Sequence, residues 1–566
     1  MFKINNLYTV NSVISKITLR VNKNMFQYPI LKSNDLIVHI SNPMINDISI
    51  IDDTSCNDST IDKSHYKKVL INSKINVSIA LYKNKKENDN LDNLNSLDLY
   101  KSESIQISID NCEFCIRKDY PELTIYDFLV SVYSNEYIIN PIDISENFYI
   151  YELNIEAKLD LAPLITIPPE NSNLIKMLNY TLSKDENNTE FTHGELSSLN
   201  ILYYANDSNL DFSIFKYFIN LDRLYLSYNY FDSLPKYFEN LSKLSNLSYL
   251  HLAENNLSSL PENFANLINL EELYLYGNNL ESLCDDFGQL INLSSLYIYN
   301  NHLESLPDSF CNLSNLTTLY MEDNKISSLP QNFAKLINLS SLSISYNNIS
   351  YLPDGFCNLS NLVELFLSNN NLCSLPSNFN NLNNLIYLDL DYNNFCTFPK
   401  IICNLSNLVC LSICGNKLNT IPKKLNQLNQ LVYLFLDENK FTALPSIIKN
   451  LDNLEMITLD KNQISNLSVL KNKNIRISAK KQEIYYGRLK EENNNYKLDL
   501  SFLRDEEDKI PFIFNISNLG HLEVEDGNTF IYWNLEEKYN SVFFEFDNHP
   551  DLDNFKFSGT VTITLE

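Results

Sequence analysis

The residue types that could carry out a reaction are present in this chain, but their spacing does not assemble a reactive site. Cys112 and Cys115 make one Cys-x-x-Cys pair, and no second pair completes a zinc site, so buried or unreactive thiols are favoured. The seven His residues lie on separate segments, without a His-Glu-x-x-His motif. The nine Gly residues never cluster as a phosphate-binding loop requires. We therefore predict no catalytic residue, no metal site and no cofactor.

One pair of carboxylates leaves a chemical alternative open. Asp389 and Asp391 are two residues apart, so on a strand both side chains lie on the same face. Such a pair could hold calcium or act as acid and base. Solvated carboxylates on strands are common, and this ordinary role is favoured. We therefore rank catalysis below binding as the function of this chain.

Charge and cysteine content narrow the partners and the compartment. The net charge of −27 argues against nucleic acid and against an anionic membrane surface, and it suits a basic partner. The 11 Cys residues, an odd number without a disulfide framework, favour reduced thiols and a cytoplasmic location. Polar residues between Asn5 and Lys16 interrupt any apolar signal segment, and no stretch is apolar enough for membrane insertion.

The dominant pattern, which would position these side chains, is a repeat of the form Leu-x-x-Leu-x-Leu-x-x-Asn. Its last residue, here called the column Asn, recurs after 26 residues once and then after 23 residues nine times. The column consists of Asn229, Asn255, Asn278, Asn301, Asn324, Asn347, Asn370, Asn393, Asn416, Asn439 and Asn462. The constant spacing predicts a solenoid in which each unit stacks on the next.

Each recurring residue of a unit has a physical task. Leu273 and Leu275 alternate as in a short strand, so both point into the core. The amide of Asn278 can donate and accept, and it can satisfy backbone groups at the turn that leaves the strand. Apolar residues on the return path close the core from the convex side: Leu280, Leu283, Phe287 and Leu290. This predicts an α/β leucine-rich-repeat solenoid with parallel strands on its concave face.

The pattern also resembles a known family. Leu-x-x-Leu-Pro-x-x-Phe-x-Asn-Leu-x-x-Leu is similar to the 23-residue leucine-rich repeats of intracellular scaffold and signalling proteins and of bacterial proteins. The resemblance covers about Leu196 to Leu470 and implies protein binding through the concave face.

Strand residues that flank the buried leucines should face the concavity, and their types are not dictated by core packing. Aromatic side chains prevail in the first half of the repeats and carboxylates in the second. Aromatic anchors and charge complementarity are typical of protein interfaces, although Tyr also has good strand propensity and neighbouring rings simply stack. The predicted protein-binding residues are Tyr225, His251, Tyr274, Tyr276, Tyr297, Tyr299, Tyr320, Phe366, Asp389, Asp391, Phe435, Asp437 and Asp460.

Strand-like segments with turn residues between them flank the repeats. The predicted organisation is a β-rich domain over 1–165, a linker over 166–195, the solenoid over 196–475 and an Ig-like β-sandwich over 476–566. Ile516-Ser-Asn-Leu-Gly520 and Phe557-Ser-Gly-Thr-Val561 resemble the Ig-like domain that caps internalin-type bacterial proteins. A strand ending in Leu81-Tyr82, a polar loop and then Ser102-Glu-Ser-Ile-Gln-Ile107 resemble the β-rich domain of clostridial spore-coat assembly proteins.

These patterns together favour a cytoplasmic bacterial scaffold or adaptor that binds a protein partner, one that could carry a basic patch. The alternative is an internalin-like adhesin or effector, exposed on the cell surface or secreted.

Overall fold

The structure is a computed structural model that divides into two compact units, Met1–Asn200 and Ile201–Glu566. It describes the backbone of the strands within residues 12–161. It also describes residues 164–566 apart from 207–209, 211, 235–240, 242, 493–494, 536–538, 548–554 and the side chains of 170, 555 and 556. No helix in the described part of the chain is long and apolar enough to cross a membrane.

The strands described within residues 12–161 form two antiparallel sheets. Strands β1 (Ser12–Asn22), β5 (Phe128–Ser134) and β6 (Pro141–Ile144) pair with β7 (Phe148–Leu161). In the other sheet β3 (Tyr66–Lys83) lies between β2 (Leu36–Asp53) and β4 (Asp98–Arg117). Cys112 and Cys115 belong to β4, but their side chains lie outside the described residues. The predicted likeness to spore-coat assembly proteins stays a prediction.

Residues 166–195, which we predicted to be a linker, are folded. Strand β8 (Ile165–Thr166) pairs with β9 (Glu190–Phe191) in a short antiparallel sheet. The 3₁₀ turn η4 (Pro169–Asn171) and α1 (Ser172–Thr181) lie between these strands in the sequence, and α2 (His193–Ser197) follows them. Leu174 and Leu178 lie on one face of α1 and are buried. The prolines and polar residues of this segment lie at the turns between these elements, and its role as a linker stays a prediction.

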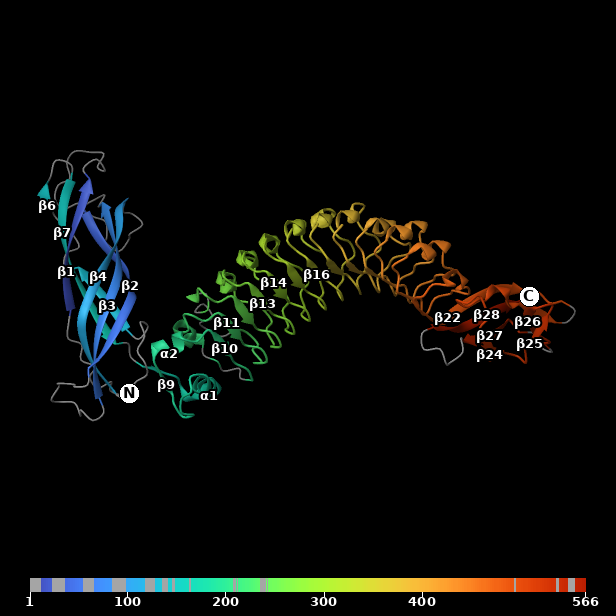
Figure 1. Ribbon diagram of the computed structural model, residues 1–566, viewed down its shortest axis with the longest axis horizontal. Helices are drawn as coiled ribbons and strands as arrows, with labels where there is room; N and C mark the ends of the chain where they lie inside the picture. Colours follow the sequence, from blue (N-terminus) through green and yellow to red (C-terminus); the bar gives the residue numbers. More distant parts are fainter. Residues whose placement is uncertain are drawn as a thin grey trace. The chain divides into compact units, whose positions relative to one another are not determined.

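The second unit is built on one sheet to which every repeat adds a three-residue parallel strand (Figure 1). These strands are β10 (Ile201–Tyr203), β11 (Arg223–Tyr225), β12 (Tyr249–His251), β13 (Glu272–Tyr274), β14 (Ser295–Tyr297), β15 (Thr318–Tyr320), β16 (Ser341–Ser343), β17 (Glu364–Phe366), β18 (Tyr387–Asp389), β19 (Cys410–Ser412), β20 (Tyr433–Phe435) and β21 (Met456–Thr458). Leu250 pairs with Leu273 and Leu273 with Leu296, so the central Leu of each strand keeps one register. This confirms the predicted parallel strands.

The outer side of the repeats described in full is a short 3₁₀ turn that packs apolar residues against the strands. The turns are η5 (Phe212–Tyr217), η7 (Glu262–Asn266), η8 (Phe287–Gln289), η9 (Asp308–Asn312), η10 (Phe333–Lys335), η11 (Asp354–Asn358), η12 (Phe379–Asn381), η13 (Lys400–Asn404), η14 (Lys423–Gln427), η15 (Ser446–Asn450) and η16 (Ser468–Leu470). Pro261, with φ −67°, stands at the N-cap of η7, where its missing N–H costs nothing.

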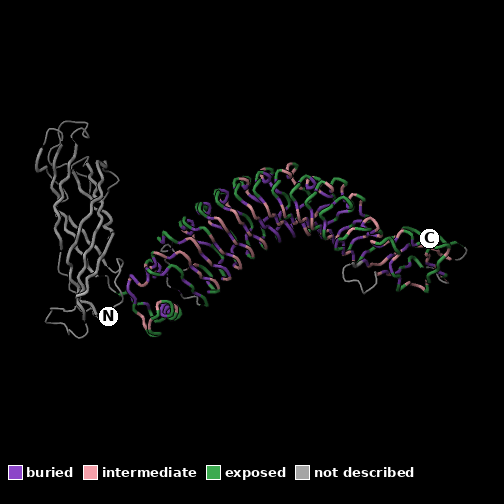
Figure 2. Tube along the Cα trace, in the orientation of Figure 1, coloured by how far each residue is buried: buried purple, intermediate pink, exposed green. Residues whose placement is uncertain are grey.

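Buried residues recur in every repeat (Figure 2). The rings of Phe264, Phe287 and Phe310 stack with centroids 6.3 and 6.0 Å apart, and each is fully buried. Burial of each such side chain stabilises the fold by about 1.5–3 kcal/mol. Cys311 and Cys357 are also buried and belong to this core.

The column Asn ties neighbouring repeats together. The Oδ1 of Asn278 accepts a hydrogen bond of 3.0 Å from the amide of Leu257, in the preceding repeat. Its Nδ2 donates to the carbonyl oxygens of Leu252, at 3.1 Å, and Leu275, at 3.0 Å. All eleven column residues are at least 92% buried, so these bonds replace water for groups that the turn leaves unpaired. The predicted use of the Asn amide is confirmed.

A left-handed residue precedes each column Asn and allows the chain to turn. The φ angles at this position lie between +50° and +64° at Tyr228, Glu254, Gly277, Asn300, Asp323, Tyr346, Asn369, Tyr392, Gly415, Glu438 and Lys461. Most of these residues have a Cβ, which makes the conformation unfavourable on its own. The hydrogen bonds of the column Asn hold it in place.

The repeat sheet continues into the C-terminal part of the chain. Strand β22 (Arg476–Leu489) pairs in parallel with β21, and then β28 (Phe555–Leu565), β27 (Ser541–Asp547) and β24 (Phe512–Phe514) extend the sheet. A separate sheet contains β23 (Tyr496–Asp499), β26 (Asn528–Trp533) and β25 (His521–Glu525), and the 3₁₀ turn η17 (Leu500–Phe502) follows β23. An Ig-like fold and the domain boundaries stay predictions.

Gln482 takes the place of the next column Asn at this transition. It is fully buried, its Oε1 accepts from the amide of Ile464 at 2.8 Å, and its Nε2 donates to the carbonyl of Leu459 at 2.8 Å. Lys481, with φ +57°, precedes it as a left-handed residue precedes each column Asn. Gln482 is thus the last side-chain amide of the ladder, and its longer side chain reaches the same backbone groups where the spacing of 23 residues is lost.

Candidate functional site

All thirteen predicted binding residues lie on the inner sheet face or directly beyond its strands, and all are partly exposed. Leu273 and Leu275 on either side of Tyr274 are fully buried, as the alternation requires. The structure gathers most of the predicted residues into two groups. The aromatic ladder consists of Tyr225, His251, Tyr274, Tyr276, Tyr297, Tyr299 and Tyr320. The acidic strip consists of Asp389, Asp391, Asp437 and Asp460. Phe366 lies between the two groups along the sheet.

Two rows of stacked rings form the aromatic ladder. In one row, the centroid of Tyr274 lies 4.9 Å from that of His251 and 4.6 Å from that of Tyr297, with interplanar angles of 7°. In the second row, Tyr276 and Tyr299 stack at 4.5 Å. Because ring faces are covered by neighbouring rings, the ladder presents ring edges and hydroxyl groups to the concavity. These groups suit hydrogen bonds with a polypeptide as well as apolar contact.

The ladder is wider than we predicted. Tyr249, one position before the central Leu of its strand, lies with its ring 5.1 Å from Tyr274, and the guanidinium of Arg223 lies 5.3 Å from the Tyr249 ring. Tyr203, on β10, stacks on Tyr225 at 4.3 Å. The strand alternation predicts that Tyr249 faces outward, because residues on both sides of the central Leu do so, but our prediction used only the outward positions after that Leu. Tyr203 belongs to β10, which precedes the repeats used for the prediction.

Burial keeps four rings of the ladder, those of His251, Tyr274, Tyr297 and Tyr299, uncharged near neutral pH. Burial raises the pKa of Tyr274 and Tyr297, and it raises the pKa of Tyr299 to about 12. Burial lowers the pKa of His251, whose Nδ1 is buried without a hydrogen-bond partner among the described residues. The Tyr274 hydroxyl donates to the Glu272 carboxylate at 2.8 Å, so a carboxylate lies beside the rings on the same strand.

The acidic strip has a structural task that the sequence did not reveal. The Oδ1 of Asp391 accepts from the Ser412 hydroxyl at 2.6 Å and from the amide of Cys414. Asp460 accepts in the same manner from the Ser478 hydroxyl and the Lys480 amide, both at 2.7 Å. Each carboxylate thereby bridges to the following strand just past the end of regular pairing. Asp437 makes the corresponding bonds to the next strand, from Thr458 and the amide of Asp460.

Asp389 differs from the rest of the strip. Its Oδ1 accepts from the amide of Asp391, at 2.9 Å, within the same repeat. Burial, together with the nearby charge of Asp391, raises its pKa to about 6. A carboxylate in this position is poorly solvated and would gain from a cation.

Phe435 lies further along the sheet beside Tyr433, with ring centroids 6.4 Å apart.

The alternative of a metal site at Asp389 and Asp391 would need a third ligand. Among the residues that the structure describes, no three His, Cys, Asp or Glu side chains gather closely enough to hold a metal ion. The Oδ1 atom of Asp391 is already engaged by a hydroxyl and an amide. The absence of a cofactor and of catalysis stays a prediction.

The repeats are leucine-rich repeats by sequence as well as by fold. The model of the leucine rich repeat family matches residues 219–280, 268–326 and 323–372, and a leucine-rich repeat region matches residues 369–482. Together with the parallel sheet, these matches confirm the predicted leucine-rich-repeat solenoid. No curated protein matches the chain in sequence.

The solved structures to which the chain is similar include three of bacterial proteins. The internalin inlF of Listeria monocytogenes is 24% identical with a TM-score of 0.50, over 56% of this chain and 92% of that one. A leucine-rich-repeat protein of Leptospira interrogans is 30% identical with a TM-score of 0.45, over 51% and 81% of the two chains. The functional domain of InlJ from Listeria monocytogenes is 18% identical with a TM-score of 0.46, over 70% and 96%. The likeness to inlF concerns the fold.

Proposed function

We propose that this chain binds a protein partner through its concave face, as a scaffold or adaptor rather than as an enzyme. The observation that carries the proposal is the continuous row of half-exposed rings on a rigid sheet, from Tyr225 to Tyr320. Rigid aromatic side chains bury much apolar area at a small entropic cost, which makes them typical interface anchors. Packing of the buried leucines beneath them does not require aromatic side chains at these outward positions, since small polar residues would serve the core equally well.

The acidic strip favours a partner with a basic patch. Asp389, Asp391, Asp437 and Asp460 lie in the second half of the repeats, in a chain whose net charge is −27. Opposite charge on a partner would speed its approach and fix its orientation along the groove. The partner's apolar surface would then meet the aromatic ladder.

We also propose a cytoplasmic location, which rests on the odd number of Cys residues in the sequence and the lack of a disulfide framework among them. The alternative is an internalin-like adhesin or effector on the cell surface or in the medium. Protease treatment of intact cells distinguishes the two. Degradation of the protein under conditions that spare a cytoplasmic marker would support the surface location.

The test of the binding proposal replaces Tyr274, Tyr297 and Tyr320 together by Ala in the full chain. Partners captured by wild-type protein are identified by mass spectrometry, and the affinity of each purified partner is measured by calorimetry. We expect the triple variant to raise Kd at least about tenfold, since loss of one interface anchor often costs about 2 kcal/mol.

The matched control replaces Ile268, Ile291 and Ile337 by Ala. These side chains are 50–54% exposed and lie in the segments that lead into the strands, away from the concave face. The control should leave Kd within about twofold. If the tyrosine variant remains folded and binds every partner as tightly as wild type, the proposal is wrong.

A further inference from the structure

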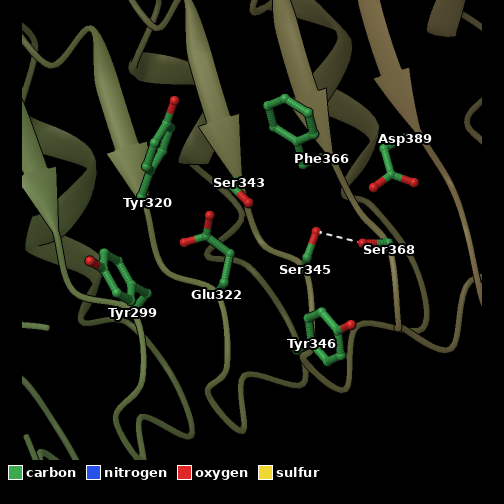
Figure 3. A pocket seen from close by; sticks show the side chains of 9 residues that line it. All are labelled: Tyr299, Tyr320, Glu322, Ser343, Ser345, Tyr346, Phe366, Ser368 and Asp389. Atoms are coloured by element: carbon green, nitrogen blue, oxygen red, sulfur yellow. Dashed lines mark hydrogen bonds between the residues drawn. The ribbon is translucent and has the colours of Figure 1, made fainter. Parts of the chain in front are cut away.

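The centre of the concave face contains an open hollow of about 630 Å³ (Figure 3). Its floor consists of three buried serines at positions that carry Tyr, Phe or Asp in many other repeats: Ser343, Ser345 and Ser368. The Ser368 hydroxyl donates to that of Ser345 at 3.0 Å. Because small residues occur on neighbouring strands, the hollow is as wide as two repeats.

Two carboxyl groups lie on opposite sides of these serines. Glu322 follows β15 on one side, and Asp389 ends β18 on the other (Figure 3). Neither forms an ion pair with a described residue. The Oε2 atom of Glu322 is buried and has no hydrogen-bond partner among the described residues. A buried carboxylate oxygen without a donor is costly, so a donor supplied from outside would be bound favourably.

The walls of the hollow are aromatic. Tyr299 and Tyr320 stand on the side of Glu322, Phe366 lies between the two carboxyl groups, and Tyr346 closes one end (Figure 3). None of the nine described residues that line the hollow is basic. Aromatic rings and carboxylates in a partly dehydrated site attract a cation that has an apolar stem.

We propose that this hollow is a pocket for a basic side chain of the protein partner, and that arginine fits it better than lysine. The proposal rests on the proposed function, because it names one chemical feature of the partner. A planar guanidinium has five N–H donors in a fixed fork and can bond to a carboxylate with two of them while its flat faces contact rings. An ammonium is a compact, strongly hydrated charge and reaches fewer of these groups at once.

The test uses the full chain and a capped peptide, Gly-Gly-Arg-Gly-Gly, whose binding is followed by saturation-transfer difference NMR. Matched peptides carry citrulline, which has nearly the shape of arginine but no charge, or lysine. We expect saturable binding of the arginine peptide, at least about threefold weaker binding of the lysine peptide and no saturable binding of the citrulline peptide.

The matched protein variants keep side-chain size. Glu322→Gln and Asp389→Asn together should weaken binding of the arginine peptide at least about tenfold, since they remove the charges that face the guanidinium. Glu304→Gln, in an exposed turn outside the hollow, should have no effect. Thermal unfolding checks that each variant is folded. In addition, Ser345→Phe fills the hollow and should block the peptide while both carboxyl groups remain.

The outcomes separate this pocket from the wider proposal. If citrulline and arginine peptides bind alike, or if the folded double variant retains the arginine peptide, the pocket proposal is wrong. If the tyrosine triple variant loses the partner while the double variant keeps an unchanged Kd for it, the concave face binds a protein but not through this pocket. Loss of the arginine peptide and of the partner in the double variant would support both.

Discussion

The column Asn gives the sharpest prediction about stability, and Asn347 at the middle of the solenoid is the best place to test it. Its Oδ1 accepts from the amide of Ile326 at 2.9 Å, and its Nδ2 donates to the carbonyls of Met321 and Ile344 at 3.0 and 3.1 Å. All these groups are buried. Replacement by Ala therefore leaves the amide of Ile326 without a partner, while the two carbonyls each lose one of two donors and keep the Nδ2 of Asn324 or Asn370.

The size of the effect follows from these three groups. A buried amide that loses its partner destabilises the fold by about 1–3 kcal/mol, and each carbonyl that loses one of two donors adds at most about 1 kcal/mol. Asn347→Ala should therefore lower the free energy of unfolding by about 2–4 kcal/mol. The matched control is Asn338→Ala. Its Nδ2 donates to the carbonyl of Ser314 at 2.7 Å in an exposed position, so its loss should cost at most about 1 kcal/mol.

Urea unfolding followed by circular dichroism compares the two variants with wild type, and hydrogen exchange locates the damage. Exchange at the amide of Ile326 should accelerate in Asn347→Ala but not in Asn338→Ala. Equal unfolding midpoints for the two variants, with Ile326 still protected, would refute the view that the amide ladder holds the repeats together.

Three further predictions concern single positions. Gly415→Ala should lower Tm, because φ is +63° there and the new Cβ would lie 2.3 Å from the ring of Tyr392, whereas Gly487→Ala meets nothing within 4 Å and should be nearly neutral. Asp389→Asn should raise Tm at pH 7.5: the pKa of about 6 lies above that of an exposed Asp, so ionisation opposes folding. This gain, at most about 2 kcal/mol, should shrink as the pH falls from about 6 to about 4 in parallel thermal melts. Gln482→Ala should destabilise the last repeat by about 2 kcal/mol in urea unfolding, and an unchanged midpoint would contradict its place in the ladder.

The repeats could be predicted because their signal is local and periodic. Leu273, Leu275 and Phe287 recur at fixed spacing, and each must be buried for a solenoid to form. The end of the ladder could not be read in this manner. Gln482 lies 20 residues after Asn462 rather than 23, so only the folded chain shows that its amide makes the same bonds.

The site was predictable as a face but not as a set of contacts. Alternation along each strand placed Tyr274 and Asp391 on the concave side, and the structure has them there. The bonds of Asp391 to the next repeat depend on where strand pairing stops, which the sequence pattern does not specify. The hollow depends on three serines from two neighbouring repeats, and it becomes visible only when adjacent repeats are compared as surfaces.

Photo-crosslinking tests the central claim most directly, because it records where the partner lies. A benzoylphenylalanine is introduced at Tyr297, on the concave face, or at Tyr351, which is 50% exposed in a turn away from that face. We predict that irradiation in cells links a protein partner to the first position and not to the second. Links from Tyr351 alone, with none from Tyr297, would contradict binding through the concave face.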